Sequence, residues 1–128
     1  MPLVRIDHAP GKPASYREAL SKGVHAALQS VFGVPEHDLF HILREHGPGT
    51  IRHAPNYLGI DYSDELVILQ ITVNDGRTLE QKKTLFATIA DNLARDPGVR
   101  RQDVMINLLE VKKENWSFGN GLAQYAPQ

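Results

Sequence analysis

The chain repeats itself at about half its length, and this repeat restricts the folds that it can adopt. GVPEHDLFHILRE begins at Gly33, and GVRRQDVMINLLE begins at Gly98, 65 positions later (98 − 33). Both read Gly-Val, three variable residues, Asp, and an apolar-rich run that ends in Glu. The same shift, without a gap, aligns apolar positions across the two halves. We predict tandem repeats at residues 2–46 and 66–111 in one domain, residues 1–128, with a C-terminal tail at 112–128.

Each half reads as a strand, a helix and a strand. Short runs rich in Val and Ile predict strands at residues 2–7, 39–45, 66–73 and 104–111. Apolar residues at helical spacing predict helices at 13–32 and 79–95. The residues expected to face inward are Leu20, Val24, Leu28 and Val31 in the first helix and Leu85, Phe86, Ile89 and Leu93 in the second. Capping-box spacing occurs at Ser15 with Glu18 and at Thr78 with Gln81.

Two such units favour an α/β (α+β) fold. Parallel strands joined by a crossover helix are the default for strand-helix-strand units, so we expect tandem βαβ units in a four-stranded sheet with both helices on one face. The ferredoxin-like fold, in which the two halves interleave, is the structural alternative. Residues 66–73 are apolar almost throughout, as in a strand covered on both faces. We therefore expect self-association to cover the second face of the sheet.

Composition excludes several function classes. The 128 residues carry 14 Lys and Arg against 15 Asp and Glu, and a net charge of −1 argues against general nucleic-acid binding. The chain has no cysteine, which excludes disulfides and thiolate chemistry. No signal peptide or membrane-length apolar run is visible, so we expect a cytoplasmic protein away from membranes. The spacing of the six histidines matches no metal site.

The chain opens MPLVRIDHAP, with a proline in second position at the start of a strand. Proline is confined to strand starts, edges and bulges, so Pro2 can be a tolerated terminal residue. Alternatively, Met1 is removed and the secondary amine of Pro2 becomes the working group of an enzyme. The pKa of such an amine responds to burial and to neighbouring charge. Position alone leaves both interpretations open.

The opening proline, the gapless duplication and the tail NWSFGNGLAQY together resemble the tautomerase superfamily. The most similar group is malonate semialdehyde decarboxylase and its relatives. The resemblance spans essentially the whole chain, and its most specific parts are Pro2, PEHD at 35–38, GRTLEQKK at 76–83 and NWSFGNG at 115–121. It implies a homotrimer of duplicated βαβ subunits, a small carboxylate substrate and no cofactor.

The resemblance also implies roles for individual residues. Pro2, exposed by removal of Met1, corresponds to the catalytic amine, and Asp38 to the acidic residue beside it. Arg77 corresponds to a carboxylate-binding arginine, and Trp116 and Phe118 to aromatic walls of the pocket. In one departure from the decarboxylase pattern, Asp75 stands where a second arginine is expected.

The residue types fit proton-transfer chemistry. A carboxylate at Asp38 would favour the protonated amine of Pro2, which suits hydration and decarboxylation more than simple tautomerisation. A neutral amine would instead take a proton from a carbon next to a carbonyl. Arg77 offers a planar fork of donors to a substrate carboxylate. We therefore expect an enzyme that tautomerises, hydrates or decarboxylates a small oxo- or unsaturated carboxylic acid.

Structural interpretations stand beside these. Asp38 can be only a turn residue, because Asp103 occupies the same place in the second repeat. Trp116 and Phe118 can serve subunit packing. Two non-enzymatic functions also remain: a trimeric binding or signalling protein of the same fold, as the cytokine macrophage migration inhibitory factor is, and a ferredoxin-like ligand-sensing module.

Overall fold

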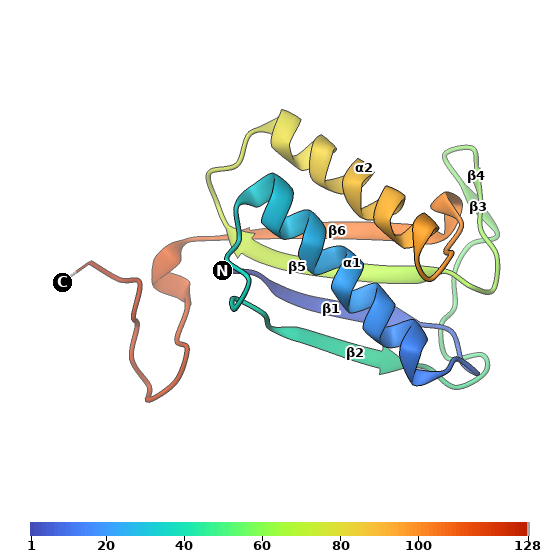
Figure 1. Cartoon of the computed structure of the whole chain (residues 1–128), viewed down its shortest axis with the longest axis horizontal. Coiled ribbons are helices and arrows are strands. Elements are labelled where there is room, and N and C mark those ends of the chain that lie inside the picture. Colours follow the sequence, from blue (N-terminus) through green and yellow to red (C-terminus); the bar gives the residue numbers. More distant parts are fainter. Residues whose placement is uncertain (128) are drawn as a thin grey trace.

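The computed structural model describes residues 1–127, in which each half contains the strand, helix and strand that the sequence predicts (Figure 1). The elements are β1 (Leu3–His8), α1 (Ala14–Phe32), β2 (His41–Glu45), β3 (Asn56–Tyr57), β4 (Ile60–Asp61), β5 (Val67–Asn74), α2 (Leu79–Arg95) and β6 (Val104–Val111), with short 3-10 turns η1 (Arg101–Asp103) and η2 (Lys113–Asn115). Every predicted strand and helix is present, with its ends shifted by at most two residues. The β3–β4 hairpin was not predicted, because it lies in a linker rich in Gly and Pro.

The four long strands form one mixed sheet in the order β2-β1-β5-β6. β1 runs parallel to β2, with Val4 opposite His41, and β5 runs parallel to β6, with Val67 opposite Val104. The two halves meet at β1 and β5, which pair antiparallel with Val4 opposite Ile71. Parallel neighbours within each half and no interleaving confirm the predicted βαβ arrangement. The ferredoxin-like alternative is wrong, and with it the ligand-sensing module built on that fold.

Both helices cover the same face of the sheet, side by side (Figure 1). The core lies between the two layers and consists of side chains with almost no exposed surface: Val4, Ile6, Leu20, Val24, Leu28, Leu69, Ile71, Leu85, Ile89 and Leu93. This set includes six of the eight predicted inward residues. Val31 and Phe86 are only half-buried, because they lie at the margins of the helix faces.

Within residues 1–127, the opposite face of the sheet has no helix over it and keeps exposed apolar side chains. Ile42, Met105 and Leu109 are 45%, 47% and 41% exposed. They alternate along β2 and β6 with residues such as Leu43, Ile106 and Leu108, which pack against the core. Period-two alternation therefore places a second apolar surface on this face, as the prediction of a covered second face requires.

The two helices begin differently. Thr78 caps α2 with a complete capping box: its hydroxyl accepts from the Gln81 N–H, and the Gln81 side chain accepts from the Thr78 N–H. The corresponding prediction for Ser15 and Glu18 is wrong. α1 begins at Ala14, and the N-cap residue Pro13 makes no side-chain cap hydrogen bond. Ser15 already lies inside the first turn. Gly33 ends α1 in the left-handed conformation, at φ 69°.

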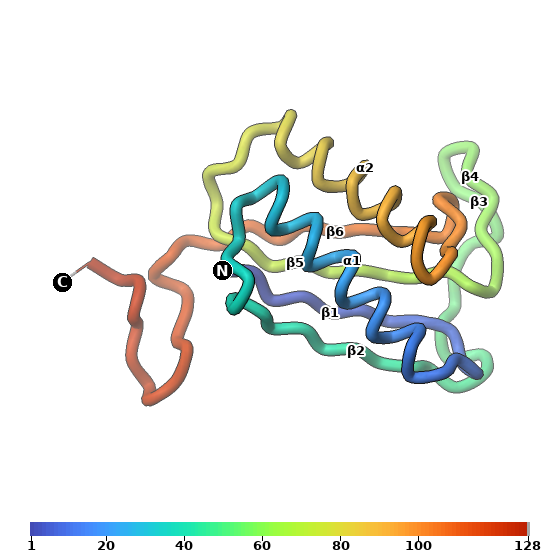
Figure 2. The backbone as a smooth tube through the Cα atoms, in the orientation of Figure 1, coloured from blue at the N-terminus to red at the C-terminus, as the bar shows by residue number. Residues whose placement is uncertain are grey.

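The strand directions bring four chain positions to one end of the sheet. Because β5 and β6 run opposite to β1 and β2, the starts of β1 and β2 lie at the same end of the sheet as the ends of β5 and β6. Figure 2 shows the amino terminus and the C-terminal segment at this end. The β3–β4 hairpin lies at the other end. Residues that precede β1 and β2 therefore meet residues that follow β5 and β6.

Candidate active site

The amino terminus is partly buried at the end of the sheet. Pro2 directly precedes β1 and is buried. Met1 in front of it places the α-amino nitrogen 3.8 Å from Asp38 Oδ2, and both side chains are only 13% exposed. The first atoms of the chain thus lie next to a carboxylate in a partly enclosed site.

Asp38 is held by the turn before β2, where its backbone N–H donates to the Pro35 carbonyl at 3.1 Å. Its Oδ1 atom is buried and has no hydrogen-bond partner within residues 1–127. A buried carboxylate oxygen without a donor is costly for a protein to keep. Asp103, at the same place in the second repeat, differs: it accepts from both the backbone N–H and the hydroxyl of Ser63. The purely structural role is therefore documented for Asp103 and not for Asp38.

Arg77 lies between β5 and α2, at the same end of the sheet. Its Nη1 donates to the Asn74 carbonyl at 3.1 Å, and its guanidinium carbon lies 4.7 Å from the centre of the Phe32 ring. Within the described part of the chain no carboxylate is in ion-pair distance of Arg77. Stacking and one hydrogen bond fix the guanidinium plane, and the remaining donors stay available for an anion.

Trp116 and Phe118 follow β6 and stack on each other, with ring centroids 5.5 Å apart. Phe118 also meets Tyr125 edge-on at 4.9 Å. The Trp116 indole N–H donates to Asn74 Oδ1 at 2.7 Å. Asn74 is therefore bonded to both Trp116 and Arg77, and it joins the aromatic pair to the arginine.

Three charged side chains act on the amino terminus. Burial has the largest effect and lowers the pKa of the Met1 α-amino group. Asp38 raises that pKa, and Arg77 and Lys113 lower it. The surroundings therefore favour a neutral amine on balance, although Asp38 acts in the direction that the sequence predicts for Pro2.

The fold places all five residues that the sequence proposes at one end of the sheet: Pro2, Asp38, Arg77, Trp116 and Phe118. Asp38 lies next to the amino terminus and Trp116 is joined to Arg77 through Asn74, whereas Phe118 contacts the tail residues Trp116 and Tyr125. The fold adds Phe32, Asn74 and Lys113, which the sequence interpretation did not include. Only weak signals marked these three: an aromatic before the helix-ending Gly33, a polar residue closing an apolar strand, and a lysine pair after β6.

The decarboxylase pattern has a second arginine where this chain has Asp75. Within residues 1–127, neither Arg5 nor Arg52 takes its place at this end of the sheet. Asp75, in its place, is exposed. Arg5 lies within β1 between the buried residues Val4 and Ile6, so it points to the outer face. Arg52 lies after β2, at the opposite end of the sheet. Lys113 is the second cation that acts on the amino terminus.

Comparison with known proteins identifies the class. A family profile described as "Tautomerase enzyme" matches residues 38–119, and a second with the same description matches residues 2–60. The probable tautomerase YusQ of Bacillus subtilis (strain 168) is 37% identical over 124 residues, covering 97% of this chain and 98% of the relative. The chain belongs to the tautomerase superfamily, as its sequence indicates.

Solved structures narrow the group. FG41 malonate semialdehyde decarboxylase, solved as inhibited by 3-bromopropiolate, is 39% identical with a TM-score of 0.89, covering 96% of this chain and 93% of that one. A fused 4-OT described as a symmetric trimer has a TM-score of 0.80 at 23% identity, covering 98% and 99% of the two chains, which shows a shared fold. Within the superfamily, the chain falls in the malonate semialdehyde decarboxylase-like group.

Proposed function

We propose that the protein is a cofactor-independent enzyme that acts on a small oxo- or unsaturated carboxylic acid through the amine of Pro2, after removal of Met1. One observation carries the proposal: the partly buried amino terminus, the Asp38 carboxylate and the Arg77 guanidinium converge at one end of the sheet, and within residues 1–127 Asp38 Oδ1 has no hydrogen-bond partner and Arg77 no carboxylate partner. Each would gain a partner if an anionic substrate with a reacting carbonyl bound there.

Arg77 anchors the substrate carboxylate. Its plane is set by the Phe32 ring and by the Asn74 carbonyl, so a bidentate pair with a carboxylate costs little further ordering. Lys113 supplies the second positive charge at this site, in place of the arginine that Asp75 replaces. Trp116 and Phe118 limit the access of water, which strengthens these charge interactions.

Pro2 moves the proton. As a neutral amine it takes a proton from the carbon next to the substrate carbonyl and returns it to another atom of the same molecule, which is tautomerisation. As a cation it donates a hydrogen bond to the carbonyl. The carbon–carbon electron pair then moves toward that carbonyl as carbon dioxide leaves, the resulting enolate takes the proton of the amine at carbon, and the amine regains a proton from solvent. Around the Met1 amine, Asp38 favours the cation, whereas burial, Arg77 and Lys113 favour the neutral form, and we expect the same groups to act on the Pro2 amine once Met1 is removed.

The proposed active form is a homotrimer. The apolar side chains of Ile42, Met105 and Leu109 on the uncovered face of the sheet support self-association. A fused 4-OT that shares the fold is described as a trimer. The described chain has no helix that combines the length and hydropathy needed to cross a bilayer. The cytoplasmic location and the lack of a nucleic-acid partner stay predictions from the sequence.

Turnover by processed protein tests the proposal. Protein whose Met1 loss is confirmed by mass is assayed for decarboxylation, hydration and tautomerisation of 2-oxo, 3-oxo and acetylenic acids of three to five carbons. We expect turnover that Pro2→Ala and Arg77→Met reduce by at least about 100-fold, the lower range for loss of an acid–base group. Arg52→Met, the same change at the other end of the sheet, serves as the control with unchanged activity. No turnover by processed trimer, with carboxylates still bound, would favour the binding or signalling function.

A further inference from the structure

The duplication creates a counterpart of the candidate active site at the opposite end of the sheet. A shift of 65 residues carries Arg77 onto Lys12 and Asp38 onto Asp103. The local backbone follows this shift. Asp38 N donates to Pro35 O at 3.1 Å, and Asp103 N donates to Arg100 O at 2.9 Å. Lys12 follows β1 and Asp103 precedes β6 at this end of the sheet. In the same way, Arg77 follows β5 and Asp38 precedes β2 at the other end.

The helix ends beside the two sites also correspond. Val34 N donates to Leu28 O after α1, and Val99 N donates to Leu93 O after α2, at 3.2 and 2.8 Å. A cavity of about 310 Å³ opens at this second place, with Lys12, Tyr16, Glu65, Val99, Arg100 and Asp103 in its lining. The lining of this cavity therefore includes two cations, Lys12 and Arg100, and two carboxylates, Glu65 and Asp103.

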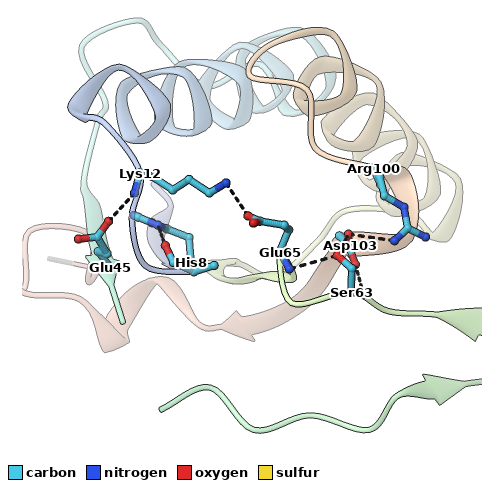
Figure 3. A network of polar contacts seen from close by, with 8 residues as sticks. His8, Lys12, Glu45, Ser63, Glu65, Arg100 and Asp103 are labelled. Atoms are coloured by element: carbon cyan, nitrogen blue, oxygen red, sulfur yellow. Dashed lines mark hydrogen bonds and ion pairs between the residues drawn. The ribbon is translucent and has the colours of Figure 1, made fainter. Parts of the chain in front are cut away.

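The two sites differ in what enters them. At the first site the chain begins, and an amine is available once Met1 is lost. At the second site Val67 takes the place of Pro2, so the chain continues and the segment 63–65 passes through the site. Figure 3 shows Ser63 facing Asp103 and Glu65 facing Lys12. The Glu65 Oε2 atom lies 2.6 Å from Lys12 Nζ.

We infer that Lys12 marks a second carboxylate-binding site of the chain, which the chain's own Glu65 occupies, so that a short-chain monocarboxylate binds there only when Glu65 is removed. The Glu65 carboxylate contacts Lys12 in the second site as we expect a substrate carboxylate to contact Arg77 in the first. Ser63 donates its N–H and its hydroxyl to Asp103 and thereby holds the segment in place. The native chain accordingly presents one open carboxylate site per subunit.

The charges at this place fit an anion. Lys12 and Arg100 face Glu65 and Asp103, and Arg100 Nη1 lies 3.5 Å from Asp103 Oδ2. Loss of Glu65 leaves the Lys12 ammonium without its carboxylate partner beside an existing cavity. Tyr16 reports on the Glu65 charge, because burial, Glu65 and Asp103, in that order, raise its pKa to about 12. Removing Glu65 should therefore lower the pKa of Tyr16.

The test is an NMR titration of the full-length protein with propionate. Glu65→Ala should show saturable shifts at the Lys12, Ser63 and Tyr16 signals at millimolar propionate, and the wild type at least about tenfold weaker binding there, a difference of about 1.4 kcal/mol. The pKa of Tyr16 should fall in Glu65→Ala. Adding Lys12→Met to Glu65→Ala should abolish the propionate shifts.

Two controls separate the outcomes. Glu80→Ala frees Lys83, its partner on an exposed helix surface, without a cavity, and should create no site. Glu65→Gln keeps the size of the side chain and replaces Glu65→Ala if that variant loses its native spectrum. A folded Glu65 variant without propionate shifts at Lys12, or a wild type that binds equally well there, overturns the inference. Because Pro2 and Arg77 lie at the other end of the sheet, either result is independent of catalysis at Pro2.

Discussion

Asp38 and Asp103 occupy the same turn of the two repeats, yet their carboxylates have different surroundings. Asp103 is fully buried and accepts two hydrogen bonds from Ser63, whereas Asp38 keeps a buried oxygen without a partner next to the amino terminus. Satisfied buried carboxylates stabilise a fold, and unsatisfied ones cost stability. Asp103 therefore stabilises the fold, whereas the buried oxygen of Asp38 lowers its stability.

The first prediction compares Asp103→Asn with Asp38→Asn. Asp103→Asn replaces an acceptor oxygen facing Ser63 with an amide, and we expect it to lower the free energy of unfolding by about 2 kcal/mol. Asp38→Asn should leave stability unchanged within about 0.5 kcal/mol and lower the activity of the processed enzyme. Urea denaturation and turnover assays measure the two effects. A larger stability loss for Asp38→Asn would assign that residue a structural role.

His41 yields a pH prediction at the same scale. Burial and the nearby His25 lower the pKa of His41 to about 4, and its Nδ1 lies 2.8 Å from Ser21 Oγ. The unfolded chain takes up a proton at this residue near pH 6.5, whereas the folded chain resists protonation until about pH 4. The unfolded state thus binds more protons between these values, so stability should fall as the pH drops from 6.5 to 4. Urea midpoints across this range should depend less on pH in His41→Gln, and an equal slope in the variant would contradict the assignment.

For the helices and the long strands, the spacing of apolar residues predicted the type and length of each element. Helical spacing in α1 and α2 and the apolar runs of β5 and β6 specified type and length, because burial of one face selects the period. Ser15 misled because capping-box spacing occurs by chance, and Pro13 already sets the start of α1. The β3–β4 hairpin was missed because its two-residue strands are exposed and carry no burial pattern.

Substitutions at Thr78 and Ser15 test which of the two helices has a side-chain cap. Thr78→Ala removes the cap of α2, and we expect a loss of about 1 kcal/mol in the free energy of unfolding. Ser15→Ala makes the same kind of change inside the first turn of α1, where no cap bond is lost, and should be neutral or slightly stabilising. Urea denaturation compares the variants. Equal losses in both would mean that Thr78 does not cap α2 in solution.

At the scale of the whole molecule, the 65-residue repeat predicted the architecture and left part of the site hidden. Strand order within each half followed from the repeat, and the antiparallel contact of β1 with β5 placed Pro2, Asp38 and Arg77 together. Asn74 and Phe32 could not be predicted, because only the folded sheet brings the end of β5 beside Trp116 and the end of α1 beside Arg77.

The uncovered face of the sheet makes a prediction about assembly. A charge at Met105, which is 47% exposed on that face, would be desolvated at a subunit contact. Light scattering should therefore show a trimer for the wild type and smaller species for Met105→Glu. Lys83→Glu on the exposed surface of α2 is the control and should leave the trimer intact. A trimeric Met105→Glu would place the subunit contact elsewhere.

We propose that Pro2, freed of Met1, is a working amine beside a carboxylate anchor. Intact mass with peptide mapping before and after exposure to 3-bromopropiolate tests this proposal. We expect a single adduct on Pro2 in processed protein, none in protein that retains Met1, and none in Arg77→Ala, while Arg52→Ala is labelled like the wild type. Processed protein whose Pro2 stays unlabelled, or whose labelling ignores Arg77, would contradict the account.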